Sequence, residues 1–97
     1  MTTITREIDQ VILIGSAMRL SPTDVDRHGV RLLVEGRHIG GPRDGETFRS
    51  THEVAKGGSL RLGPIVTVTV VELFEDAVRL GVLAPPNLPV VRAETGR

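Results

Sequence analysis

The side chains most often used in catalysis and metal binding are sparse in this chain, and their spacing suits neither task. His28, His38 and His52 fall in a turn, a connector and a strand, without the paired ligand spacing of a zinc site. The aspartates lack the loop that surrounds a calcium ion, and turn chemistry explains them better. No nucleophile, base and orienting group can be combined into an active site. We therefore expect no enzyme, no metal site and no cofactor.

Arginine is the remaining residue type that could recognise a ligand. The chain has 12 Lys and Arg against 12 Asp and Glu, so its net charge is zero. Binding of a nucleic acid would therefore require a local basic patch. The aromatic residues are only Phe48 and Phe74, and the stacking platforms of common RNA-binding domains are missing. Taken alone, Arg6 and Arg92 are most simply solvated charges beside Glu7 and Glu94.

The elements that hold these residues must form one small domain. A chain of 97 residues suits one core, and with few aromatic residues that core must consist of Val, Leu and Ile, which favour strands. There is no Cys, so disulfides are excluded. The N-terminus has no signal-peptide core, and the longest apolar runs, near residues 11–14 and 68–71, are too short to span a membrane. We expect a cytoplasmic protein with no membrane partner.

A repeat at one constant offset is the strongest pattern in the chain. Gly15 and Gly63 each close a short apolar run, and their separation defines the repeat offset. Val30 and Val78, separated by the same offset, each begin a Val-Arg-Leu strand after a turn. Strand candidates at residues 17–25 and 65–73 are related in the same way. Several matches at one offset indicate an internal duplication.

Alternation of residue types indicates strands throughout. Residues 66–70 alternate valine and threonine, which predicts a half-buried strand with Thr67 and Thr69 on its polar face. Residues 26–29 form the turn of a hairpin, with Gly29 free to adopt a positive φ. The glycine-rich residues 36–45 form a connector between the copies. Helical periodicity is confined to a weak stretch before Lys56, so the sequence predicts an all-β fold.

These strands resemble the carbon storage regulator (CsrA/RsmA) family. Residues 4–15, which begin Ile-Thr-Arg and end in an apolar run closed by glycine, are similar to the family's Leu-Thr-Arg opening. Residues 66–72 and 78–85 resemble its central strands, and residues 88–94 resemble its closing strand. Each motif alone is unspecific because it consists mainly of Val, Ile and Gly, but their order and spacing are specific together.

The resemblance implies a CsrA-like β-barrel or sandwich. Typical members are intertwined homodimers of five-stranded chains, in which the first strand of one protomer lies beside the last strand of the other. Two fused copies imply a monomeric single-chain pseudo-dimer of two five-stranded repeats with intertwined strands, in one domain over residues 1–97, with repeats at 1–45 and 46–97. The family's C-terminal helix is expected to be absent, because the sequence ends soon after the closing strand.

The two copies keep different parts of the family's RNA-binding edge. Residues 4–6 retain the opening motif in the first copy, whereas the repeat offset places His-Glu-Val at residues 52–54 in the second. The closing strand keeps Val90 and Arg92 in the second copy, whereas the repeat offset places Pro42 and Asp44 in the first. The resemblance thus implies one retained site, where Arg6 and Arg92 meet. Its expected residues are Ile4, Thr5, Arg6, Leu88, Val90, Val91 and Arg92.

At this site the resemblance implies recognition of GGA elements in mRNA, in a single strand or a hairpin loop, and hence regulation of translation. The arginine guanidinium groups would bind phosphate or guanine O6 and N7, and strand backbone would read base edges. Ile4, Leu88 and Val90 would supply apolar contacts.

Two departures from the family weaken the positive field at this edge. Glu7 replaces a residue that is usually basic, and Val91 replaces a histidine, so RNA affinity is expected to be lower than in typical members. The alternative is a protein-interaction module that keeps the fold without RNA binding, for example one that binds a flagellar-assembly antagonist of the kind that binds this family.

Overall fold

The computed structural model of the chain describes residues 1–93, which form nine β-strands and no helix. The all-β prediction is confirmed for this range. The weak helical stretch before Lys56 is the end of a long strand. The strands are β1 (Thr2–Glu7), β2 (Val11–Ile14), β3 (Met18–Val25), β4 (Gly29–Arg37), β5 (Thr47–Ala55), β6 (Ser59–Leu62), β7 (Val66–Leu73), β8 (Ala77–Leu83) and β9 (Val90–Ala93).

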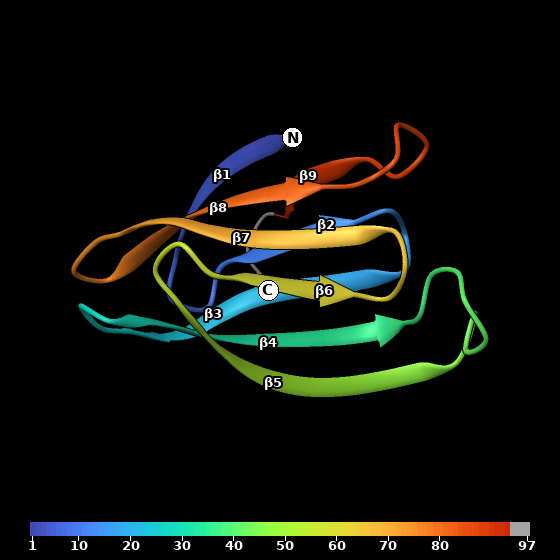
Figure 1. Ribbon diagram of the computed structural model, residues 1–97, viewed down its shortest axis with the longest axis horizontal. Coiled ribbons are helices and arrows are strands. Elements are labelled where there is room, and N and C mark those ends of the chain that lie inside the picture. Colours follow the sequence, from blue (N-terminus) through green and yellow to red (C-terminus); the bar gives the residue numbers. More distant parts are fainter. Residues whose placement is uncertain (94–97) are drawn as a thin grey trace.

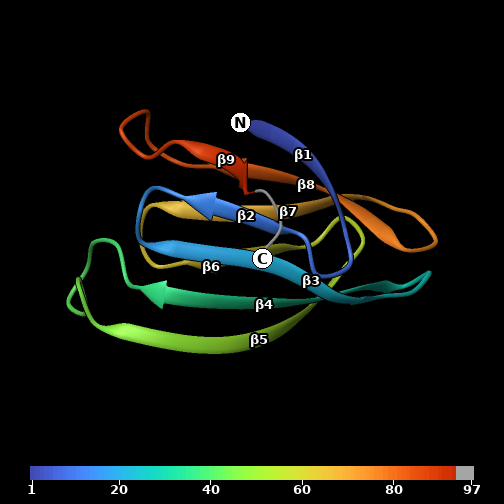
Figure 2. The same cartoon turned by 180° about the vertical axis from the view of Figure 1, so that it is seen from behind.

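The strands form two antiparallel sheets that face each other (Figures 1 and 2). The four-stranded sheet has the order β1-β8-β7-β6, and the five-stranded sheet has the order β5-β4-β3-β2-β9. Neighbours far apart in the sequence are therefore paired: β1 lies beside β8, and β9 lies beside β2. As a result, each sheet contains strands from both halves of the chain.

Strand positions repeat at the offset that separates Gly15 from Gly63. Both ends of β2 are related by it to the ends of β6, and both ends of β3 to the ends of β7. The register of β3 with β4 shifts between Pro22 and Asp24, and that of β7 with β8 shifts at the corresponding positions, Val70 and Glu72. The origin of this repetition in a duplication stays a prediction.

The prediction of two five-stranded repeats is wrong for the first repeat, which has four strands within residues 1–45. Residues 38–46 form a loop that turns the chain directly from β4 into β5. Gly40, Gly41 and Gly45 have φ values between 76° and 86°, a region that only glycine adopts easily. The Gly40 N–H donates to Asp44 Oδ1 at 2.7 Å within this loop. With its glycines in this conformation the loop cannot extend as a strand. Among the described residues, the sheet that contains β6 therefore has four strands and not five.

The core lies between the two sheets and consists of alternate residues of each strand. Val66, Val68 and Val70 of β7 are buried, whereas Thr67 and Thr69 between them are half-buried on the outer face. The predicted half-buried strand is confirmed. The residues that are completely buried come from both sheets: Ile12, Ile14, Leu20, Leu32, Val34, Val68, Val70, Val78 and Leu80.

Gly29 serves a different purpose from the one predicted, because its φ is not positive. Asp26 closes the turn instead, since its carboxylate accepts the backbone N–H groups of His28 and Gly29. A Cβ atom at Gly29 would lie 2.4 Å from the carbonyl oxygen of Val54 on β5. Glycine is thus required here by the close approach of a neighbouring strand.

Candidate nucleic-acid interface

β1 and β9 carry most of the expected site, and each forms an edge of a different sheet. The hydrogen-bonded neighbour of β1 is β8 and that of β9 is β2, so the two strands do not pair with each other. Both strands nevertheless lie along the same side of the molecule, at the top of Figures 1 and 2. The candidate interface is therefore a pair of edges on two layers, not two strands within one sheet.

The strand registers place Arg6 and Arg92 on faces that point toward each other. Arg6 lies opposite Val78, and Arg92 lies opposite Ile12. Directly opposed residues of antiparallel strands share one face of the sheet. Since Val78 and Ile12 are both fully buried in the core, each arginine projects from the inner face of its own sheet.

The two arginines differ in exposure. Arg6 is only 6% exposed, whereas Arg92 is exposed. The interpretation of Arg6 as a solvated surface charge is therefore wrong. Its neighbour Glu7 is exposed on the opposite face of β1. Glu94, the residue that could pair with Arg92, lies outside the described residues.

The apolar residues of the expected site pack mainly against the core. Ile4 is 6% exposed and belongs to the core cluster, so its side chain contacts the interior and is not presented to a ligand. Leu88 and Val90 are half-buried and pack against the same cluster. The Gly15 N–H donates to the carbonyl of Pro89 at 2.8 Å, which fixes the segment that leads into β9.

Thr5 and Val91 lie on the outer faces that flank the pair of edges. Val91 is 47% exposed and lies opposite Leu13. Thr5 is exposed, and its Oγ1 accepts a hydrogen bond of 3.4 Å from Arg79 Nε. These two residues and Arg92 therefore form the accessible part of the expected site.

Arg79 on β8 is a candidate that the sequence analysis missed. It is exposed directly beside Thr5, and its guanidinium lies 5.3 Å from the ring centre of Phe74. The signal was present in the sequence, because Val78-Arg79-Leu80 alternates and its two apolar members must face the core. Arg79 adds a second exposed guanidinium to this side of the molecule.

The opposite side of the molecule has no arginine on β5 that corresponds to Arg6. The repeat offset relates Arg6 to Val54, which is 7% exposed in the core. It relates Ile4 to His52, whose Nε2 lies 2.8 Å from Ser50 Oγ. In the sequence, the positions that the repeat offset relates to β9 fall within the loop of residues 38–46. The two sides are therefore chemically different.

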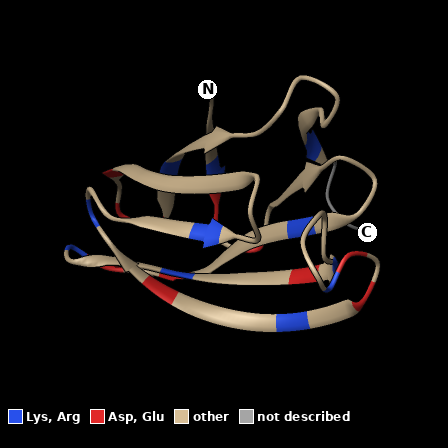
Figure 3. Cartoon of the chain, turned by 45° about the vertical axis from the view of Figure 1, so that its right-hand side comes forward, with Lys and Arg blue, Asp and Glu red and all other residues tan. Residues whose placement is uncertain are grey.

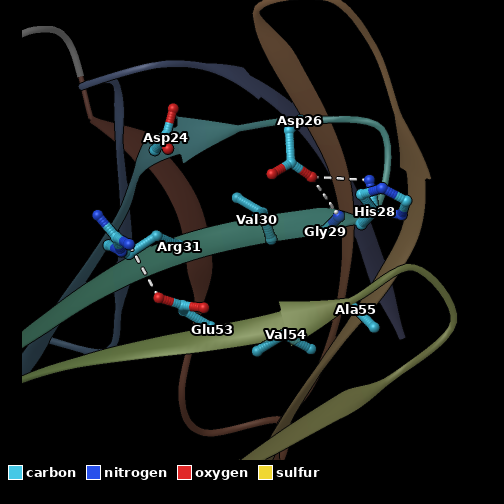
Figure 4. A pocket seen from close by; sticks show the side chains of 9 residues that line it. All are labelled: Asp24, Asp26, His28, Gly29, Val30, Arg31, Glu53, Val54 and Ala55. Carbon is cyan, nitrogen blue, oxygen red and sulfur yellow. Dashed lines mark hydrogen bonds and ion pairs between the residues drawn. The ribbon is translucent and has the colours of Figure 1, made fainter.

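A shallow pocket of about 290 Å³ lies between β5 and the turn that joins β3 to β4 (Figure 4). Asp26 Oδ1 accepts the N–H groups of His28 at 2.7 Å and Gly29 at 3.0 Å, and these bonds lower the pKa of Asp26. Arg31 and Glu53 form an ion pair of 2.8 Å across β4 and β5. These interactions hold the turn and the strand pair together.

Membrane-spanning helices and clusters of metal-ligating side chains are not found within residues 1–93. No helix in this range has the length and hydropathy needed to cross a membrane. Within the same range, no three His, Asp or Glu side chains come together in a way that could hold a metal ion.

Comparison with known families matches the part of the chain that carries β9. Residues 55–97 match the family model of CsrA, described as a global regulator protein family. The CsrA match begins at the last residue of β5 and includes β6 to β9. It supports the family resemblance of this segment and leaves the tandem duplication untested. The comparisons with curated proteins and with solved structures give no match.

Proposed function

We propose that the protein is a post-transcriptional regulator that binds GGA elements of mRNA at the β1/β9 edges. The observation that carries this proposal is the arrangement of Arg6 and Arg92, which project from facing layers at one side of the molecule. The CsrA match of residues 55–97 supports it, because this segment includes Arg92. The proposal involves no catalysis and no cofactor.

The proposal includes a single-chain pseudo-dimer, in which each half of the chain completes the sheet of the other. Pairing of β1 with β8 and of β9 with β2 supports it. In such an arrangement one chain supplies both edges of the site. Because the two halves are covalently linked, their association is intramolecular and does not carry the entropic cost of bringing two separate protomers together.

The exposed groups suggest how RNA is held. The Arg92 guanidinium offers a planar fork of donors that fits a phosphate or the O6 and N7 atoms of guanine. β1 and β9 are edge strands among the described residues, and their outer backbone groups can read base edges. Arg79 and Thr5 flank this surface. Arg6, being buried, supports the inner side of the edge and adds positive charge.

A second candidate is a protein-interaction module of the same fold, for example one that binds a regulatory antagonist. Two observations favour it: the net charge is zero, and Arg6 is largely removed from solvent. Both weaken the electrostatic attraction to RNA. Val91, 47% exposed at the β9 edge, would suit a protein partner.

A gel shift at fixed salt concentration distinguishes the two candidates. The RNA probe is a short hairpin with GGA in its loop, and the control is the same hairpin with that triplet changed to CCU. We expect the GGA hairpin to bind at least about tenfold more tightly, because loss of good base contacts costs about 1–3 kcal/mol each. Equal weak binding of both hairpins would contradict the RNA proposal and favour the interaction module.

A further inference from the structure

β5 has a free edge that is unusually well suited to pairing. It is nine residues long and pairs with β4 on one side only, and no other described strand lies on its outer side. The residues Thr47–Ala55 include no Pro and no Lys, the types that most often protect edge strands. Its backbone is therefore open to an added strand.

The sequence of β5 is complementary to itself when two copies run antiparallel about Thr51. In this register Thr51 faces its own counterpart, and residues equally far before and after it face each other. Every pair is compatible. The pairs are Thr51 with Thr51, Ser50 with His52, Arg49 with Glu53, Phe48 with Val54, and Thr47 with Ala55.

The charges on the outer face strengthen this register. Arg49 ion-pairs with Glu35 of β4 at 3.5 Å, and Glu53 ion-pairs with Arg31 at 2.8 Å. The side chains of Arg49 and Glu53 are each 73% exposed despite these partners, so both can accept a second one. Figure 3 shows an acidic and a basic stretch on this long bottom strand.

Pairing about Thr51 would place Glu53 of one copy against Arg49 of the other. The Arg31–Glu53 pair of one chain would then continue across the interface into the Arg49–Glu35 pair of the other. The two-fold symmetry of the dimer creates this row of alternating charges twice. Opposite charges directly across antiparallel strands are stabilising, whereas like charges are destabilising. A register shifted by two positions would place Thr51 opposite Arg49 or Glu53 and lose both pairs.

The inner face of β5 is also compatible with this arrangement. Phe48 is half-buried and stacks on His38 with 4.3 Å between ring centres. In the same register Phe48 faces Val54 of the second copy, which covers apolar surface. Ser50 and His52, already 2.8 Å apart within the chain, face their counterparts and can share hydrogen bonds.

We propose that β5 is a homodimerisation edge, where a second copy of this chain adds antiparallel about Thr51. The two five-stranded sheets then form one continuous sheet with a two-fold axis at Thr51. This interface lies on the opposite side of the molecule from β1 and β9, so the proposal does not depend on RNA binding.

Sedimentation velocity over a concentration series tests the proposal with two charge-reversal variants. Arg49→Glu places Glu opposite Glu53 twice in a symmetric dimer, and Glu53→Arg places Arg opposite Arg49 twice. We expect the parent chain to dimerise and each variant alone to associate at least roughly tenfold more weakly. An equimolar mixture should regain the dimer, because the two variants together restore both opposite-charge pairs.

Circular dichroism of each variant confirms that the fold is kept, and Arg61→Glu on β6 serves as the matched control. Arg61 is exposed on the edge strand of the other sheet, so its reversal should leave dimerisation unchanged. A monomeric parent at all concentrations would overturn the proposal. So would dimerisation of both variants at parental strength, or a mixture that associates no better than its components.

Discussion

Arg92→Ala is expected to weaken binding of the GGA hairpin by roughly 30-fold without lowering the melting temperature. The loss follows from removal of charge-assisted or bidentate hydrogen bonds, which contribute about 1.5–3 kcal/mol. Stability should be unaffected because the Arg92 side chain is exposed at the end of a sheet. Fluorescence anisotropy with labelled hairpin, together with a thermal melt, measures both quantities.

The salt dependence of the same variant identifies what Arg92 contacts. If it binds a phosphate, Arg92→Ala should reduce the slope of log K against log salt by about one. If it binds guanine, the slope stays and discrimination between GGA and CCU is lost. Arg61→Ala is the matched control, because Arg61 is also an exposed strand arginine and lies on β6, at the edge of the four-stranded sheet opposite to β1. An equal loss in both variants, or none in Arg92→Ala, would contradict the proposed site.

Arg6 is a less informative position for the same experiment. Its side chain is 6% exposed, so Arg6→Ala removes buried stem as well as charge. Loss of RNA binding in that variant would combine a local effect with a loss of folding stability. Arg92 and Arg79, both exposed, separate the two effects.

Leu32→Ala and Leu80→Ala are each expected to lower the free energy of unfolding by about 3 kcal/mol, the usual cost of truncating a buried leucine. The two leucines are related by the repeat offset, occupy the middle of β4 and β8, and are completely buried. Truncation loses the transfer free energy of the side chain and leaves a cavity. Since the stability of such a domain is about 5–15 kcal/mol, either change is a large fraction of it.

Urea denaturation measures this cost and also tests how the halves depend on each other. We expect one cooperative transition for the parent and for both variants, because each sheet contains strands from both halves. Leu83→Ala is the control, since Leu83 is 56% exposed and should cost less than about 0.5 kcal/mol. Two separate transitions, with each leucine affecting only one, would contradict this coupling.

Local features of the fold were predictable because they depend on neighbouring residues. The alternation in residues 66–70 gave the buried and outer faces of β7, and the glycines of residues 40–45 gave the loop. The pairing of β1 with β8 was different, because no local pattern determines which distant strands become neighbours. Only the family resemblance implied exchange between halves, and its expectation that the first and last strands lie side by side is wrong, because β1 and β9 belong to different sheets.

Side-chain exposure at the site was predictable only where apolar neighbours in the same strand show which face of that strand points into the core. Arg79 follows from Val78 and Leu80, which must be buried. The Thr-Ile-Thr-Arg segment of β1 gave no such indication, because either face could have been the inner one; the structure buries Ile4 and Arg6. Gly29 was misjudged because the carbonyl of Val54 that excludes a Cβ comes from β5, which reaches Gly29 only after the chain has turned back through the loop.

Backbone NMR of the isotopically labelled chain, titrated with the GGA hairpin, tests the proposal of one retained RNA site most directly. The account predicts saturation at one RNA per chain, with the large chemical-shift changes in β1, β9 and the neighbouring part of β8. Saturation at two RNAs per chain, or comparable changes along β5 and β6, would contradict it.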